Sequence, residues 1–401
     1  MLDRLFGPAP KYRKTLAAIG LLLLFGTAVW VARNQIPPGN RLFKHDIYYS
    51  FVEGQRILDG SNPYSRIHTG DMSNNNKYAT YFPGFYLLSA ATQAFGARDI
   101  ADWLAFWRVI FALFYLAIGG FVFVEGRRAF GAGFAFFCAA LWLFNRWTVN
   151  ILYNANIDFP PIFFLLLSLA IFKRHPTASF LLLGVSLALK QIAIFALPLY
   201  LIWAWKSSAA NRPWPAALRA VALIAAVPLV CSVYFLAWDA TGFIKSILFS
   251  ATRVASSHVH TATINQALGW TGPAGRIPML FTLGLVYLAA LKSDMGRYTA
   301  ALFALVVFSV MNPVLYNQYF CWVMALIPLA ACDGAAMRAG HKAKQIEVQL
   351  SEPNPPSPPK SWQLAMAKSS EESGGRRGFA GAHPRYSRPA SGRAPRAARS
   401  R

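Results

Sequence analysis

Residues 40–64 read NRLFKHDIYYSFVEGQRILDGSNPY and end in the turn sequence Asn-Pro-Tyr. It follows a first long apolar run and carries an acidic residue, Asp46, on a partly apolar background. From Asp46 to Leu58 the apolar residues recur at loosely helical spacing, which predicts an amphipathic helix at a membrane surface. Asn62 and Pro63 should end this helix, because the residue before a proline avoids helical geometry.

The composition indicates an integral membrane protein. Hydrophobic residues make up 55% of the chain and charged residues only 14%, a balance that a soluble domain of this size would not carry. The four cysteines fall in or beside apolar runs without paired spacing, so they are interpreted as packing residues and not as disulfides or metal ligands. They are Cys138, Cys231, Cys321 and Cys332.

Ten apolar runs predict about ten membrane spans. Several are shorter than the roughly 20 residues that a helix needs to cross a bilayer, so flanking turns or bundle packing should contribute. Basic residues near the N-terminus place that end inside, and ten spans also place the other short basic segments inside. This count requires residues 81–95 to form an external surface or re-entrant helix. The runs are 15–32, 103–124, 130–144, 159–172, 178–189, 192–205, 217–238, 277–291, 299–311 and 319–331.

The predicted fold class is therefore all-α: a polytopic helix bundle over residues 1–337, with residues 33–102 as the first external loop. Residues 338–401 are rich in proline, glycine, serine and arginine and should form a disordered, basic cytoplasmic tail. The net charge of +23 lies mainly in this tail and in short loops. Membrane lipid is thus the expected partner of the basic residues, and nucleic acid is not.

Three short motifs carry a family resemblance. Asp46 lies near the start of the predicted external loop, two glycines precede Asn62-Pro63-Tyr64, and Tyr81-Phe82-Pro83-Gly84 follows. Over residues 15–333 this pattern resembles the polytopic C-superfamily glycosyltransferases, and among them the bacterial polyprenyl-phosphate-mannose-dependent α-mannosyltransferases. The resemblance implies a polyprenyl-phosphate hexose donor, most simply mannose, a glycan or glycolipid acceptor, and inversion at the anomeric carbon. It places the chemistry on the periplasmic face of a bacterial inner membrane.

Asp46 is the candidate general base, because the attacking hydroxyl must lose its proton as it reaches the anomeric carbon. It coincides with the catalytic Asp of the family that the chain resembles. The alternative is an acidic residue that only stabilises a helix N-terminus. Glu53 and Asp59 lie on the same surface stretch and are expected in solvent.

The departing phosphate requires cations or hydrogen-bond donors. Lys190 interrupts a largely apolar stretch, where a lysine is costly unless it meets water or an anion; the alternative is that it snorkels to the interface. Arg108 is a second intramembrane cation and resembles an arginine of related transferases. Arg253 and His258, on the largest later external loop, complete the donor-phosphate candidates.

Amides and a carboxylate precede the span that starts at residue 159. Asn154, Asn156 and Asp158 are candidates to bind sugar or acceptor hydroxyls, together with Tyr81; helix capping is the alternative for the first three. No cofactor is expected. A divalent cation held by Asp46 and Asp158 is left open.

The predicted function is a membrane glycosyltransferase. The main rival is a lipid or sugar transporter or flippase without covalent chemistry, and a non-catalytic assembly subunit is a third alternative. A transporter that alternates access usually keeps its polar residues near the midplane and contains an internal repeat. Here the polar residues lie on one side and no repeat is visible, which favours the enzyme.

Overall fold

The structure is a computed structural model that describes residues 11–34, 46–68, 78–208, 213–252, 256–257, 263–270 and 272–351. The chain divides into two units, Met1–His341 and Lys342–Arg401. The described residues of the second unit, 342–351, are the end of helix α15. The fold and the sites below belong to the first unit.

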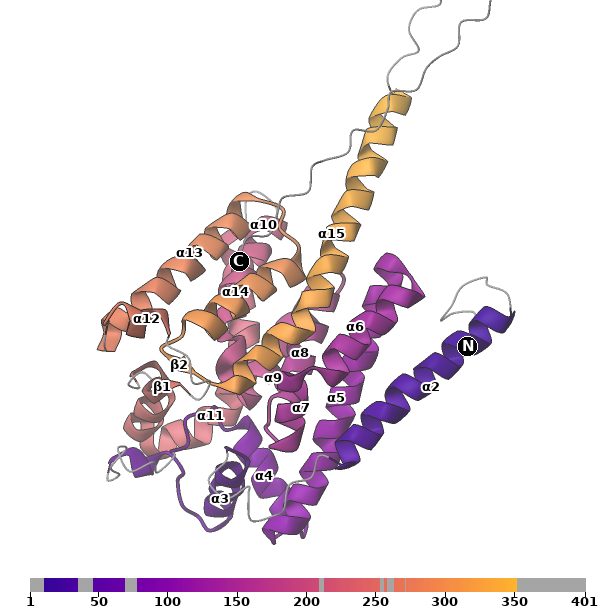
Figure 1. Ribbon diagram of the computed structural model, residues 1–401. Helices are drawn as coiled ribbons and strands as arrows, with labels where there is room; N and C mark the ends of the chain where they lie inside the picture. Colours follow the sequence, from indigo (N-terminus) through magenta and orange to yellow (C-terminus); the bar gives the residue numbers. More distant parts are fainter. Residues whose placement is uncertain are drawn as a thin grey trace, which may run out of the picture. The chain divides into compact units, whose positions relative to one another are not determined.

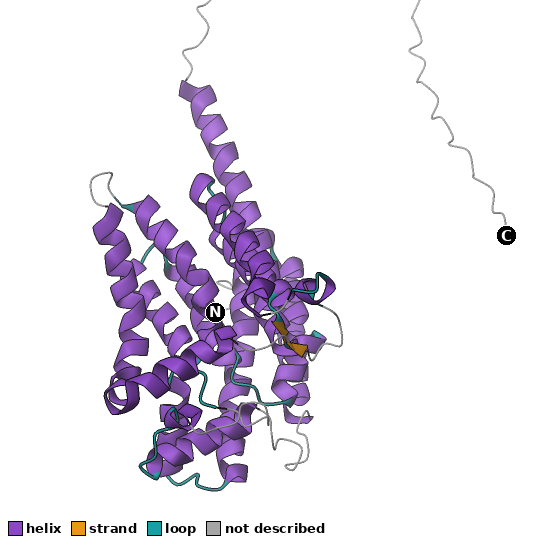
Figure 2. Ribbon diagram, turned by 90° about the vertical axis from the view of Figure 1, so that its left-hand side faces the viewer, coloured by secondary structure: helices purple, strands orange, loops and turns teal. Residues whose placement is uncertain are grey.

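Helices make up nearly all of the described chain, which confirms the predicted all-α class (Figures 1 and 2). The only strand pairing in the described ranges joins two residues of β1 to two of β2 in parallel. In chain order the elements are α2 (Lys11–Asn34), α3 (Asp46–Leu58), η2 (Ser65–His68), α4 (Gly84–Ala94), α5 (Ile100–Phe130), α6 (Ala132–Phe144), α7 (Arg146–Tyr153), α8 (Phe159–Ile171), α9 (Pro176–Leu189), η4 (Gln191–Ala196), α10 (Leu197–Ser207), α11 (Pro213–Thr252), β1 (Ser256–Ser257), α12 (Ile264–Ala267), η5 (Gly272–Arg276), α13 (Ile277–Lys292), α14 (Arg297–Met311), β2 (Val314–Leu315) and α15 (Asn317–Ser351).

Five helical segments are long and apolar enough to cross a membrane, or six if the bent pair α6–α7 counts as one span. The five are Lys14–Asn34, Ile100–Phe130, Pro213–Phe249, Gly272–Lys292 and Asn317–Ala335. The predicted number of about ten is not confirmed. Three of the predicted runs form the short helices α8, α9 and α14, and a fourth is divided between η4 and α10. Polar residues at the run ends, such as Lys190 and Asn145, interrupt the helices there.

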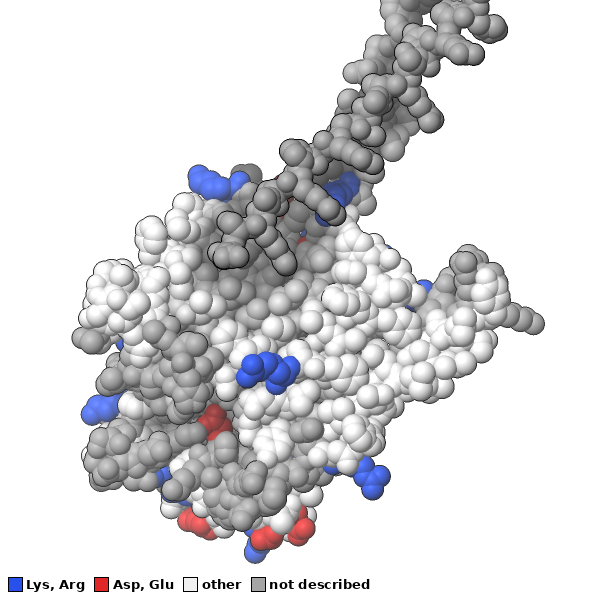
Figure 3. Space-filling view, viewed as in Figure 1, with Lys and Arg blue, Asp and Glu red and all other residues white. Residues whose placement is uncertain are grey.

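Large apolar side chains face outward along several of these helices. Leu22 on α2 and Val230 on α11 are each 74% exposed, and α13 presents a similar row of leucines and Phe281. Contiguous apolar surface of this kind marks a region that meets lipid or a protein partner. On the face in Figure 3 many charged side chains lie near its ends; a basic group and an acidic group lie nearer the middle, among wide uncharged areas. Together with the apolar helices, these faces identify a membrane protein.

Helix α3 has the bounds that the sequence predicts, Asp46–Leu58, but it does not end at Asn62-Pro63. Gly60 has a φ of +72°, and the amide nitrogens of Gly60 and Ser61 donate to the carbonyls of Ile57 and Arg56. These two bonds are a Schellman motif, in which a left-handed glycine satisfies the last carbonyls of a helix. Glycine adopts this backbone without strain, so the signal that ends α3 is Gly60.

Helices α8 and α9 form an antiparallel hairpin joined by a short turn. Ser168 and Ser179 each donate through Oγ to the other's backbone carbonyl, at 2.7 and 2.8 Å. Nearer the other end, Ser186 Oγ donates to the carbonyl of Pro161 at 2.7 Å. Because the two helices have nearly equal length, Asp158 before α8 and Lys190 after α9 meet at one end of the hairpin.

The segment that includes α3 and α4 lies against this end of the hairpin and against α11 (Figure 1). A Cβ atom on Gly84 would lie 2.6 Å from the carbonyl oxygen of Ala188, so only glycine lets α4 start this close to α9. Helix α11 continues to Thr252, past the predicted end of its span at residue 238, through a kink at Asp239. The Asp239 carboxylate accepts from Ser65 Oγ at 2.8 Å and lies 3.0 Å from His68 Nε2, which fastens η2 to α11.

Helix α15 runs to Ser351, beyond residue 338 where the predicted tail begins. The remainder of that predicted tail, residues 352–401, lies outside the described residues.

Candidate functional site

A fully buried ion pair lies at the meeting point of α8, α9 and α15. Lys190 Nζ donates to both carboxylate oxygens of Asp158 at 2.8 Å, and Trp322 Nε1 donates to Asp158 Oδ1 at 2.7 Å. The Lys190 side chain is 1% exposed and the Asp158 side chain 0% exposed. A buried ion pair of this kind is tolerated because the partners satisfy each other and a third donor occupies the carboxylate.

The geometry of this ion pair excludes helix capping for Asp158 and snorkelling for Lys190, the two alternatives that the sequence left open. Asp158 is the N-cap residue of α8, but its side chain makes no capping bond. Helix capping is therefore not its role. Lys190 does not snorkel to an interface either, since its ammonium is buried against Asp158.

Asp46 is linked to α15 and to the α7–α8 turn by two amide side chains. Gln318 Nε2 donates to Asp46 Oδ2 at 3.3 Å, and Asn156 Nδ2 donates to Gln318 Oε1 at 3.0 Å. Because Asn156 occupies the oxygen of the Gln318 amide, the nitrogen of that amide is turned toward Asp46. This chain of bonds fixes the orientation of one carboxylate oxygen.

The turn that carries Asn156 has an unusual backbone. Ala155 has a φ of +50°, the only positive value at a non-glycine residue in the part of the chain that the structure describes. Left-handed backbone costs an ordinary residue about 1–2 kcal/mol, and such strain concentrates at functional sites. The conformation lets Asn156 and Asp158 follow α7 directly and reach the same end of the bundle.

Tyr81 lies beside both carboxylates. The Lys190 ammonium is 5.4 Å from the centre of the Tyr81 ring, and the Tyr64 hydroxyl donates to the Tyr81 carbonyl at 2.8 Å. Burial, and after it the negative charge of Asp46, raises the pKa of Tyr81 well above its usual value. Its phenol therefore stays protonated and available as a hydrogen-bond donor at physiological pH.

Arg108 is a partly buried cation in the first half of α5. It lies on α5, and its Nε and Nη2 atoms are shielded from solvent with no hydrogen-bond partner among the described residues. A guanidinium with buried, unsatisfied donors favours binding of an anion at that position.

The other predicted site residues are not seen to join these contacts. Asn154 turns back onto α7, where its amide nitrogen donates to the carbonyl and side-chain oxygen of Asn150 at 3.0 and 3.1 Å. Arg253 and His258 lie outside the described residues. Within the described ranges no three His, Cys, Asp or Glu side chains are grouped to hold a metal ion.

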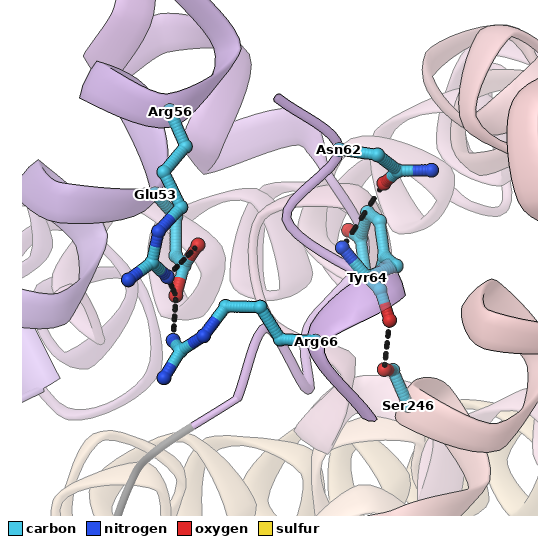
Figure 4. Close-up of polar contacts among 6 residues, drawn as sticks. All are labelled: Glu53, Arg56, Asn62, Tyr64, Arg66 and Ser246. Carbon is cyan, nitrogen blue, oxygen red and sulfur yellow. Dashed lines mark hydrogen bonds and ion pairs between the residues drawn. The ribbon is translucent and has the colours of Figure 1, made fainter. Parts of the chain in front are cut away.

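Glu53 contradicts the expectation that it lies in solvent. Its side chain is 1% exposed, accepts from Arg56 at 2.8 Å through both oxygens, and lies 3.3 Å from Arg66 (Figure 4). Burial raises the pKa of Glu53 above its usual value, and the two arginines oppose that rise. The neighbouring loop is fixed by Tyr64, whose amide donates to Asn62 Oδ1 and whose carbonyl accepts from Ser246 Oγ (Figure 4).

Gln318, Trp322 and Glu53 were the residues that the sequence did not assign to the site or its support. Gln318 was visible only as one of several polar residues before the last apolar run. Trp322 gave no signal, because a tryptophan within an apolar run is ordinary.

No protein-family model, no curated protein and no solved structure matched this chain when each was compared with it. The resemblance to the mannosyltransferases stays a prediction from the motifs.

The buried position of Glu53 predicts that its acceptor atoms and packing stabilise the fold. Glu53→Ala removes the shared acceptor of two arginines and should cost about 1–3 kcal/mol. It should lower the apparent melting temperature of the purified protein in detergent by several degrees. Glu53→Gln keeps one acceptor oxygen and avoids a buried charge, so its melting temperature should stay close to that of the unmodified protein.

Asp59→Ala is the matched control, because Asp59 is exposed one residue after α3. Since the folded-state pKa of Glu53 is raised, its contribution to stability is present below the unfolded pKa and falls as pH rises through the folded value. Glu53→Gln should lack that decline. An equal loss from Glu53→Ala and Asp59→Ala would contradict the structural role.

Proposed function

We propose that this protein is a membrane glycosyltransferase that moves a hexose from a polyprenyl phosphate to an acceptor hydroxyl, with Asp46 as the general base. The observation that carries the proposal is the oriented Asp46 carboxylate, held by Gln318 and Asn156 beside Tyr81. A general base needs a fixed carboxylate oxygen within reach of the proton that it removes. Asp46 Oδ2 accepts from Gln318 Nε2 at 3.3 Å, and a carboxylate is the kind of group that takes up the proton of an attacking hydroxyl.

Arg108 is the proposed partner of the donor phosphate. Its buried Nε and Nη2 groups, which lack acceptors, would donate to two oxygens of the phosphate. A planar guanidinium fits such a bidentate contact better than an ammonium does. Lys190, by contrast, is already neutralised by Asp158. Its proposed role is therefore to hold Asp158 and the Tyr81 ring in place, and not to contact the phosphate directly.

The proposed reaction is a displacement at the anomeric carbon. The acceptor hydroxyl loses its proton to Asp46 while its oxygen forms the new glycosidic bond, and the bond from the anomeric carbon to the carrier phosphate breaks. The phosphate leaves with the electron pair, and Arg108 stabilises its charge. Mannose as the sugar, and inversion at the anomeric carbon, follow from the family resemblance.

The proposed topology has ten spans, with both termini in the cytoplasm and residues 40–78 on the periplasmic side of a bacterial inner membrane. The helix ends opposite the Asp46 site support this orientation, because they are basic and meet one another. Lys206 Nζ, at the end of α10, donates to the carbonyl of Ser293 after α13, and Arg297 at the start of α14 donates to the carbonyl of Leu169 near the end of α8. Basic ends on one side are typical of the cytoplasmic face.

The first prediction of this proposal concerns catalysis. Asp46→Asn keeps size and hydrogen bonding but removes the proton acceptor, so transfer from polyprenyl-phosphate mannose should fall by about 10²–10⁴-fold in membranes. The matched change Asp59→Asn, at an exposed position, should leave transfer within roughly twofold. Near-normal transfer by Asp46→Asn would remove Asp46 from the mechanism. An unmodified protein that transfers to no acceptor would favour the transporter.

Gln318 should act as a positioning residue for Asp46. Gln318→Leu removes the donor to the carboxylate and should lower transfer roughly tenfold, the value of a hydrogen bond to a charged group. Gln318→Glu places a second carboxylate against Asp46, which favours the protonated acid. The acidic limb of the pH–rate profile should then move to higher pH.

That shift separates positioning from a purely structural role. A variant that only loosens the fold would lower the rate without moving the acidic limb. An unchanged pH profile in Gln318→Glu, with the protein still folded, would contradict the role given to Gln318.

Topology is tested with single cysteines in a background without the four native ones. Ser61→Cys should react with a membrane-impermeant maleimide added outside cells, and Ser370→Cys should react only after the membrane is opened. Reaction of both from the same side would exclude the ten-span arrangement.

A further inference from the structure

A second site lies at the end of the α8–α9 hairpin that is remote from Asp158. A cavity of about 670 Å³ opens there, between the α8–α9 turn and the adjoining ends of α10 and α11. Helix α8 has 13 residues, and a rise of 1.5 Å per residue separates the cavity from the buried ion pair by about 20 Å. The two sites are therefore independent in space.

The polar lining of the cavity is cationic. Lys173 and Arg219 face it with the hydroxyls of Thr177, Ser207 and Ser208, and no acidic residue lines it. Arg219 Nη2 lies 2.9 Å from Thr177 Oγ1, to which it donates. Neither cation has an ion-pair partner within the described ranges, so their charge is not neutralised there.

The N-terminus of α9 adds to this positive potential. Helix α9 begins at Pro176, and its N-cap residue, His175, makes no side-chain capping bond. Thr177 is thus in the first turn of a 14-residue helix, where the helix dipole favours a negative group.

The rest of the lining is apolar and firmly held. Phe172 packs edge-on against Phe180 and against Tyr200 and Trp203, with ring centroids 5.6–5.8 Å apart. The Tyr200 hydroxyl is in turn 2.7 Å from Ser168 Oγ in the hairpin. A ligand that fits must therefore carry an anionic group beside an apolar portion.

We propose that this cavity binds the headgroup of an anionic phospholipid, with the phosphate against Lys173 and Arg219 and the glycerol and first acyl carbons on Phe172 and Phe180. A phosphate diester supplies the negative charge that two cations and three hydroxyls can hold. Basic pockets at the ends of membrane helices bind such headgroups. The site needs neither the proposed transferase activity nor the proposed orientation.

The test uses the full-length protein purified in detergent and phosphatidylglycerol with a fluorescent acyl chain. The unmodified protein should bind this lipid saturably and bind phosphatidylcholine weakly. The double variant Lys173→Gln with Arg219→Gln should bind the lipid roughly 25-fold more weakly. Each cation near a phosphate contributes about fivefold to the affinity, and the variant lacks two. The exchanged variant Lys173→Arg with Arg219→Lys should keep most of the affinity.

Two further variants control for charge and for the cavity. Arg128→Gln with Lys292→Gln removes the same charge from exposed positions elsewhere and should leave binding unchanged. Ser207→Trp keeps both cations but fills the mouth of the cavity, so binding should be lost. Melting temperatures close to that of the unmodified protein show that each variant is folded.

Unchanged affinity in the double variant overturns the proposal, as does equal weakening in the charge-matched control. Inorganic phosphate provides the last arm. If millimolar phosphate displaced the labelled lipid as strongly as unlabelled phosphatidylglycerol does, the cavity would be a site for free phosphate, and the lipid proposal would be overturned. Weak competition by phosphate, with full competition by the lipid, is the expected result.

Discussion

The arrangement of the polar residues depends on the ion pair between Asp158 and Lys190. Each ion would lose several kcal/mol of hydration on burial, and their mutual bonds with the Trp322 indole offset that loss. Removing one partner would leave an uncompensated charge, at a cost of about 3–5 kcal/mol. The pair and the Trp322 indole therefore join one end of α8, α9 and α15. Asn156 precedes α8 and Gln318 lies on α15, so this junction places both amides near Asp46. Lys190, which follows α9, lies over the Tyr81 ring.

Helix α3 belongs both to the proposed active site, through Asp46, and to the buried cluster around Glu53. Glu53 and its two arginines fix α3 to the loop that follows it, and Asp239 fixes η2 to α11. Asp46 begins the same helix, so these anchors also limit where its carboxylate can lie. The Asp46 carboxylate, the proposed general base, is therefore held from two sides: by the packing of α3 and by the Gln318 amide of α15.

Local signals in the sequence predicted the elements better than the contacts between them. The spacing of apolar residues gave the bounds of α3, and Gly60 carried the signal for its end although Asn62-Pro63 attracted the prediction. Asp46, Tyr81, Asn156, Asp158 and Lys190 were recognisable because each is polar at the edge of an apolar run. Their pairing was not recognisable in the same way: Trp322 is 164 residues from Asp158 and Gln318 is 272 residues from Asp46. Glu53 was misplaced because a charged residue on an amphipathic helix usually faces water. Its burial is tolerable because Arg56 on the same helix and Arg66 beyond the turn both pair with it.

The α8–α9 hairpin also constrains the length of the chain. One inserted residue turns the rest of an α-helix by about 100° and moves it by 1.5 Å. An insertion within either helix would rotate Asp158 away from Lys190 and part the serine contacts along the hairpin. Loops elsewhere can lengthen at small entropic cost. Insertions and deletions should thus be tolerated in the segments around the bundle and excluded from these two helices, where the number of residues matters as much as their identity.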